Sequence, residues 1–198
     1  MSLLEHLGEY LVIGGFSVIV YAMIQNRIFP KRRSPYSRHF EDRARVYEVM
    51  NEVLQGTSAK RFLILKTTNG GGKPRIGAHL YASVLYEDFI SPFHSVKAEY
   101  QRVVVDSVYI NMLSDISRRG TMFFDTSGME EGILKRIYDS EGVAASMVAY
   151  LNETSDAFYY CSIATDHSGI KGFVSEVEQL RIELSLNRLR DTFRRAQK

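Results

Sequence analysis

The chain has 198 residues, of which 45% are hydrophobic and 24% are charged, and its formal net charge is +2. This balance is that of a globular protein with enough apolar residues for a real core, and it excludes extensive disorder. A single cysteine, Cys161, excludes an internal disulfide and agrees with a reducing cytoplasmic location.

An uncharged apolar run, Tyr10 to Ile24, lies near the start of the chain and predicts a membrane anchor. A helix across a hydrocarbon core about 30 Å thick needs roughly 20 mainly apolar residues, and Leu7 to Phe29 supplies about that length. Residues 1–29 are therefore interpreted as a single transmembrane helix. A cleaved secretory signal is disfavoured because basic residues follow the run instead of preceding it. A buried core helix is the stronger alternative, since short apolar runs are ambiguous.

A basic cluster follows the apolar run, whereas the residues before the run carry only acidic charges. Its members are Arg27, Lys31, Arg32 and Arg33. The positive-inside rule then places the N-terminus outside and the rest of the chain in the cytoplasm. We expect this cluster to contact anionic lipid at the membrane surface; nucleic acid is the disfavoured alternative partner for such charge. Residues 30–37, with two prolines, form a basic linker, and a cytoplasmic domain is expected over residues 38–198.

The domain is predicted to alternate helices with antiparallel hairpins. Periodicity and turn residues predict these elements in chain order: a helix over Phe40 to Leu54, strands at Arg61 to Thr68 and within Ile76 to Glu87, a helix from about Ala98 to Ile116, a strand at Gly120 to Asp125, a short helix at Met129 to Tyr138, strands at Val143 to Leu151 and Ala157 to Thr165, and a helix over about Gly172 to Ala196. This order predicts an α+β domain, with a five- to six-stranded antiparallel sheet and the N- and C-terminal helices on one face.

The final helix carries two opposed apolar sides. One side holds Phe173, Val177, Leu180 and Leu184, and the other holds Ile182, Leu186, Leu189 and Phe193. We expect the first side to cover the sheet and the second to form a dimer interface, as part of a helical bundle between two chains. The alternative is that the second side packs beside the first helix within one chain.

The element order resembles a GAF domain, a relative of the PAS and profilin-like folds. The resemblance covers about Phe40 to Arg195 and rests on the opening hairpin RFLILKTTNGGGKPRIGAHLYASVLYED and on SMVAYLNETSDAFYYCSIATD before a long helix. It implies a small-molecule pocket on the sheet, built here by Phe89 to Met129, and dimerisation through the terminal helices. The Asn-Lys-Phe-Asp-Glu signature of cyclic-nucleotide-binding GAF domains is absent. A Cys-His pair for a linked bilin is absent too, because Ser162 follows Cys161.

Catalytic and metal-binding patterns are not found in the sequence. The segment Asn69 to Lys73 lacks P-loop spacing and is better interpreted as a hairpin turn. The five histidines have no metal-ligand spacing, so no metal or other cofactor is expected. Ser127 and the cluster Asp166 to Ser168 lack a nucleophile elbow and are typical of loops. Tyrosines such as Tyr109 and Tyr160 could stack on a ligand, but packing is the favoured interpretation.

Three classes of function remain. The leading one is a membrane-tethered, non-catalytic GAF-like binding or scaffold module that recognises a small molecule or a protein partner. The alternative is a structural subunit of a membrane-associated assembly, such as a viral one. An enzyme with an unrecognised site is disfavoured, because no catalytic constellation emerges from the residues.

Overall fold

The computed structural model describes residues 34–70, 75–167 and 175–195. The predicted anchor, Leu7 to Phe29, and the basic cluster at Arg27 and 31–33 lie outside these residues. Within the described residues, no helix combines the length and hydropathy that a membrane crossing requires. Contacts divide the chain into two units, Met1–Glu41 and Asp42–Lys198. The fold described below is that of the second unit.

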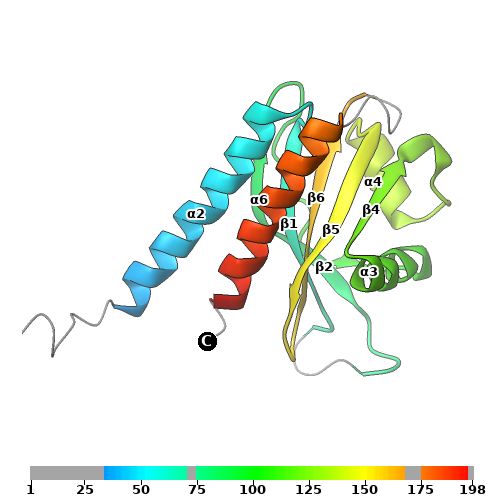
Figure 1. Ribbon diagram of the computed structural model, residues 1–198. Coiled ribbons are helices and arrows are strands. Elements are labelled where there is room, and N and C mark those ends of the chain that lie inside the picture. Colours follow the sequence, from blue (N-terminus) through cyan, green and yellow to red (C-terminus); the bar gives the residue numbers. More distant parts are fainter. Residues whose placement is uncertain (1–33, 71–74, 168–174, 196–198) are drawn as a thin grey trace, which may run out of the picture. The chain divides into compact units, whose positions relative to one another are not determined.

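The fold is an α+β architecture around one six-stranded antiparallel sheet, as predicted (Figure 1). The elements are α2 (Pro35–Gly56), β1 (Arg61–Thr68), β2 (Tyr81–Phe89), β3 (Val103–Val104), α3 (Ser107–Arg119), β4 (Thr121–Asp125), the 3-10 turn η1 (Thr126–Gly128), α4 (Ile133–Ser140), β5 (Ala145–Glu153), β6 (Phe158–Thr165) and α6 (Glu176–Arg195). The strands lie side by side in the order β3-β2-β1-β6-β5-β4.

The sheet separates two apolar cores, because successive side chains of a strand point to opposite faces. On one face, α6 and the part of α2 from Asp42 onward pack on Phe62, Ile64 and their neighbours. On the other face, α3 and α4 pack on Leu65, Val148 and their neighbours (Figure 1). The terminal helices therefore share one face of the sheet, as predicted, and the other face carries α3 and α4.

The ends of α2 and α6 are joined by polar contacts, and the two helices run antiparallel (Figure 1). Arg181 Nη1 donates a hydrogen bond of 2.6 Å to the carbonyl oxygen of Gly56. A side chain at Gly56 would displace the end of that arginine, since an added Cβ would overlap its Nη1. Arg188 also forms an ion pair with Glu52 of α2. Both contacts lie at the surface, above the apolar core that α2 and α6 share.

The predicted assignment of the two sides of α6 is wrong. Ile182, Leu186 and Leu189, predicted to form a dimer interface, are at most 1% exposed and belong to the core beneath the helix. Phe193, the fourth residue of that set, is partly buried, with its ring centroid 5.4 Å from that of Tyr159. The physical reason is that α6 has two apolar stripes of similar hydrophobicity, and the sequence alone does not show which stripe packs against α2 and the sheet.

The other side of α6 is exposed, although it was predicted to cover the sheet. Val177 is 70% exposed, and Leu180 and Leu184 are each 59% exposed. They lie three and four residues apart, so they form one row along the helix.

The predicted start of the helix that ends near Ile116 is also wrong. The helix α3 begins at Ser107, not near Ala98, and the side chain of Asp106 caps it by accepting a hydrogen bond from the backbone N–H of Tyr109. The preceding β-branched residues Val103 and Val104 form the edge strand β3 beside β2. Strand propensity thus outweighs the helical spacing at this point.

Candidate ligand-binding site

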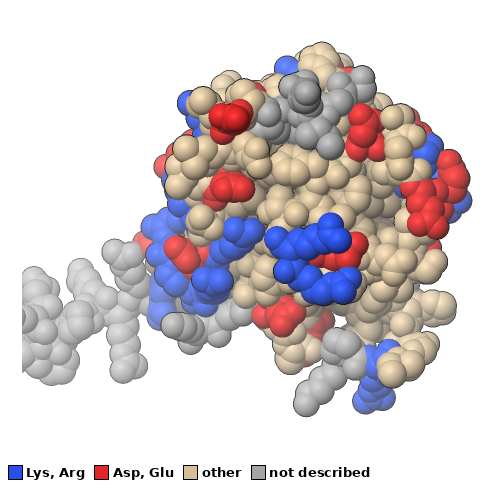
Figure 2. All heavy atoms as spheres, turned by 45° about the vertical axis from the view of Figure 1, so that its right-hand side comes forward, with Lys and Arg blue, Asp and Glu red and all other residues tan. Residues whose placement is uncertain are grey.

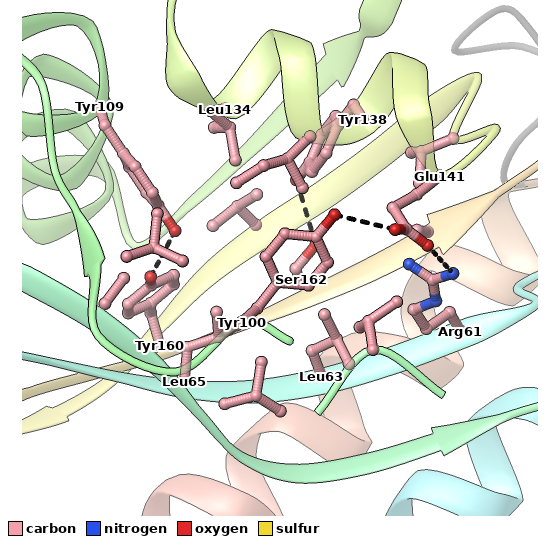
Figure 3. A pocket seen from close by; sticks show the side chains of 18 of the residues that line it. Arg61, Leu63, Leu65, Tyr100, Tyr109, Leu134, Tyr138, Glu141, Tyr160 and Ser162 are labelled. Carbon is pink, nitrogen blue, oxygen red and sulfur yellow. Dashed lines mark hydrogen bonds and ion pairs between the residues drawn. The ribbon is translucent and has the colours of Figure 1, made fainter. Parts of the chain in front are cut away.

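A cavity lies on the α3 and α4 face of the sheet, between the strands and the segments that connect them (Figure 3). Its volume is about 50 Å³. Each water molecule needs roughly 10–15 Å³ on this scale, and a cavity that accepts benzene measures about 150 Å³. The cavity therefore has room for only a few non-hydrogen atoms as it stands.

Most of the cavity wall is apolar, and it comes both from the sheet and from the helices and loop that cover this face of the sheet. The floor consists of strand residues whose side chains point away from α2 and α6: Leu63, Leu65, Ala82, Val84, Val103, Val148 and Ala164. Val96 contributes from the loop after β2, Met112 from α3, and Leu134 and Ile137 from α4. Such walls favour the apolar part of a ligand.

One end of the cavity is charged. Arg61, the first residue of β1, is only 3% exposed, and its Nη2 lies 3.1 Å from Oε2 of Glu141, which follows the last turn of α4. The hydroxyl of Tyr100 donates a hydrogen bond of 2.8 Å to the other carboxylate oxygen of Glu141. The guanidinium carbon of Arg61 also lies 4.4 Å from the ring centroid of Phe93. Figure 3 shows Arg61, Glu141 and Tyr100 together at this end.

The remaining polar groups of the cavity bond to one another. At the end opposite Arg61, the hydroxyl oxygens of Tyr109 and Tyr160 lie 2.5 Å apart (Figure 3). In the wall, the Tyr138 hydroxyl bonds to Ser146 and Ser162, at 3.1 Å each. Burial raises the pKa of all three tyrosines, in the case of Tyr109 well above its ordinary value. These hydroxyls stay protonated at neutral pH and are already paired.

No nucleophile activated by a neighbouring base is seen among the described residues that line the cavity. Cys161 belongs to the opposite core, beneath α2 and α6, and burial raises the pKa of its thiol to about 12. Ser127 lies in the turn η1, where its hydroxyl donates to the carboxylate of Asp125. Across the described ranges, no group of three or more potential ligands could hold a metal ion.

The predicted pocket segment is only part of the cavity wall. Phe89 to Met129 supplies Val96, Tyr100, Val103, Tyr109 and Met112. The strands, α4 and the residues just after α4 supply the rest, including the polar residues Arg61, Tyr138, Glu141 and Ser162, none of which was predicted from the sequence to be a site residue. One signal in the sequence could have pointed to Arg61. In the strand RFLILKTT, Arg61 and the buried Leu65 are an even number of positions apart, so the charged side chain of Arg61 lies on the same face of the sheet as that leucine.

Three arginines in the second half of α6 pair with acidic and carbonyl groups. Arg188 contacts Glu52, Arg190 donates to the carbonyl oxygen of Tyr150, and Arg194 lies 3.9 Å from Asp191. Figure 2 shows acidic side chains interspersed among the basic ones on the face it presents.

Comparison with known proteins identifies the fold. No family model matches the sequence, and no curated protein matches it. Solved structures of GAF domains do match. The third GAF domain of a Synechocystis sp. PCC6803 protein, in its photoproduct state, has a TM-score of 0.56 and 9% identity over 79% of this chain and 95% of that one. The GAF domain region of a putative membrane protein from Geobacter sulfurreducens PCA has a TM-score of 0.53 and 12% identity, over 80% and 97% of the two chains.

A further match is the chromophore-binding domain of an unusual bacteriophytochrome from R. palustris, with a TM-score of 0.53 and 11% identity. The match covers 84% of this chain but only 64% of that one. Identities this low show the fold alone. The chain therefore has a GAF-like fold, as its element order predicts.

Proposed function

We propose that this chain is a membrane-tethered, non-catalytic GAF-like module that binds a small molecule in the cavity beneath α3 and α4. The observation that carries the proposal is the cavity itself, with apolar walls and a buried charged end. Ligand sites typically combine mainly apolar walls with a few polar groups that orient the ligand. The similarity to a chromophore-binding domain supports a ligand-binding role for this fold.

The ligand is expected to be small. The cavity of about 50 Å³ is well below the roughly 150 Å³ that accepts benzene. A large chromophore such as a bilin would require the surrounding segments to move apart. Within the present geometry, the cavity fits a molecule of a few non-hydrogen atoms.

Filling the cavity is expected to abolish ligand binding without unfolding the protein. Ala82 lines the cavity and is 3% exposed, so Ala82→Val places two methyl groups in the space a ligand would occupy. Methyl NMR of the full chain, titrated with a library of small molecules, measures binding. The control is Val104→Leu, which adds bulk at a residue 51% exposed. If the wild type and Ala82→Val bind the ligand with equal affinity, the ligand binds outside the cavity.

We also propose that residues 1–29 tether the module to a bilayer, with the domain on the cytoplasmic side. The support is the apolar run and the basic cluster that follows it. The full chain is expected to float with liposomes at high salt and alkaline pH, and a chain beginning at Ser34 is expected not to. Flotation of the shorter chain under these conditions would contradict the tether.

The exposed row on α6 is the surface we propose for homodimerisation. Val177, Leu180 and Leu184 present three adjacent apolar side chains on one helix. A second copy of the chain, offering the same row, would bury both rows. The proposal replaces the interface predicted from the sequence, because that side of the helix is already buried.

A further inference from the structure

An open groove of about 340 Å³ lies beside the cavity on the same face of the sheet. It is bordered by α3, by the edge strand β4 and by the segment that leads from η1 into α4, and much of its lining is apolar, including Met122, Phe124 and Met129. Met112 of α3 and Leu134 of α4 line both the groove and the cavity, and no other described residue does (Figure 3). These two side chains therefore form the partition between the cavity and the groove.

The partition can open by a change of side-chain rotamer alone. Met112 and Leu134 are each 6% exposed, and both side chains are apolar. Methionine is unbranched and has three rotatable bonds, so it adapts its shape readily. The helix backbones can stay in place, because the Asp106 side chain accepts hydrogen bonds of 2.9 and 2.6 Å from the backbone N–H groups of Tyr109 in α3 and Ile133 in α4.

The loop between β2 and β3 also covers the cavity, to which it contributes Val96 and Tyr100. Polar contacts hold this loop down. The Glu87 carboxylate accepts hydrogen bonds from the Ser95 hydroxyl at 2.6 Å and from the backbone N–H of Val96 at 2.7 Å. The Tyr100 hydroxyl donates to Glu141. Lifting the loop would break these bonds together, whereas opening the partition breaks none of them.

From these observations we infer that small uncharged molecules enter the cavity through the groove, and that Met112 and Leu134 are the gate. A charged group would have to leave water to pass two buried apolar side chains, which is unfavourable. With the gate open, the cavity of about 50 Å³ and the groove of about 340 Å³ become continuous, within the roughly 300–1,000 Å³ of typical ligand pockets. This inference rests on the proposed function and adds the route of entry and the residues that control it.

Modification of a cysteine placed in the cavity measures entry. Val148 lines the cavity and is 1% exposed, whereas Cys161, the only natural cysteine, lies in the core on the other face of the sheet. The full chain carrying Val148→Cys is treated with methyl methanethiosulfonate, a small uncharged thiol reagent, and mass spectrometry of peptides gives the rate at each cysteine. Cys161 reports unfolding, so entry into the folded protein should make the introduced cysteine react about tenfold faster or more.

Variants in the same background identify the route. Met112→Ala widens the gate and is expected to raise the rate at the introduced cysteine, relative to that at Cys161, by about another tenfold. The matched control is Leu113→Ala, which truncates the next residue of α3; Leu113 is 7% exposed and lines neither the cavity nor the groove. Glu87→Gln weakens the attachment of the loop between β2 and β3. Both of these variants should leave the relative rate unchanged.

The outcomes separate the inference from the proposed function. Acceleration by Glu87→Gln but not by Met112→Ala would overturn the inference and leave the proposed function standing, because molecules would then enter beneath the loop. Equal relative rates in Met112→Ala and Leu113→Ala would also overturn the gate. If the introduced cysteine reacts no faster than Cys161 before either gate or loop is changed, small molecules do not enter the folded protein at the cavity. The proposed function then fails together with the inference.

Discussion

Replacing Leu186 with glutamate is expected to unfold the domain. Leu186 is 1% exposed and lies between α6, α2 and the sheet. Truncating a buried leucine alone costs about 2–5 kcal/mol, and a buried unpaired carboxylate costs more. Their sum approaches the whole stability of a typical domain, about 5–15 kcal/mol. Circular dichroism during urea denaturation measures the loss.

The matched control lies two residues away on the same helix. Leu184 is 59% exposed, so Leu184→Glu is expected to leave the stability of the monomer, measured at concentrations too low for dimerisation, within about 0.5 kcal/mol of the wild type. Because both variants make the same chemical change in the same helix, helix propensity cancels. A folded Leu186→Glu protein together with an unfolded Leu184→Glu protein would reverse the assignment of the two sides of α6.

The same exposed side tests the proposed dimer. Leu180→Glu/Leu184→Glu is expected to stay folded and to sediment as a monomer under conditions in which the wild type sediments as a dimer. Sedimentation velocity at tens of micromolar distinguishes the two species. A wild-type monomer at that concentration would rule out a dimer of ordinary affinity.

Removing Arg61 alone is expected to destabilise the protein strongly. In Arg61→Met the carboxylate of Glu141 loses its ion pair while its side chain remains 6% exposed. Breaking a buried ion pair on one side costs about 3–5 kcal/mol. Urea denaturation of Arg61→Met should therefore show a midpoint far below that of the wild type.

The double variant Arg61→Met/Glu141→Met supplies the control. Replacing both members of a buried pair by apolar residues is often neutral, so the double variant should recover most of the lost stability. Tyr100, which then loses its acceptor, is only partly buried and can bond to water. A double variant as unstable as the single one would show that the pair does not act as a unit.

The fold was predictable because its elements have strong local signals. The strand Arg61–Thr68 was predicted with the bounds the structure gives it, since an apolar run there is followed by a glycine-rich turn. The later hairpin, β5 and β6, was predicted within a few residues. Together with the long final helix, these elements were enough for the resemblance to GAF domains.

The orientation of α6 could not be predicted in the same way. The sequence shows two apolar stripes, and the choice between them depends on which stripe packs against α2 and the sheet in the folded chain. Helical periodicity is a property of one segment, whereas burial depends on what the segment meets. This is why Leu186 and Leu189 were assigned to the wrong neighbour.

The cavity was only partly predictable for a related reason. Arg61 and Glu141 are 80 residues apart in the sequence, and neither belongs to a motif. Their pairing arises because β1 and the end of α4 lie side by side in the fold. The apolar wall could be anticipated from the alternation in the strands, but the charged end required the tertiary structure.

Methyl NMR under xenon pressure tests the central claim, that the α3 and α4 face of the sheet holds a cavity that side chains do not fill. Xenon enters small apolar cavities and shifts the methyl groups around it. We predict pressure-dependent shifts at Leu63, Leu65 and Val84, and none at Val49 and Val53, which lie in the core on the other side of the sheet. Unshifted cavity methyl groups, or equal shifts on both sides of the sheet, would contradict the account.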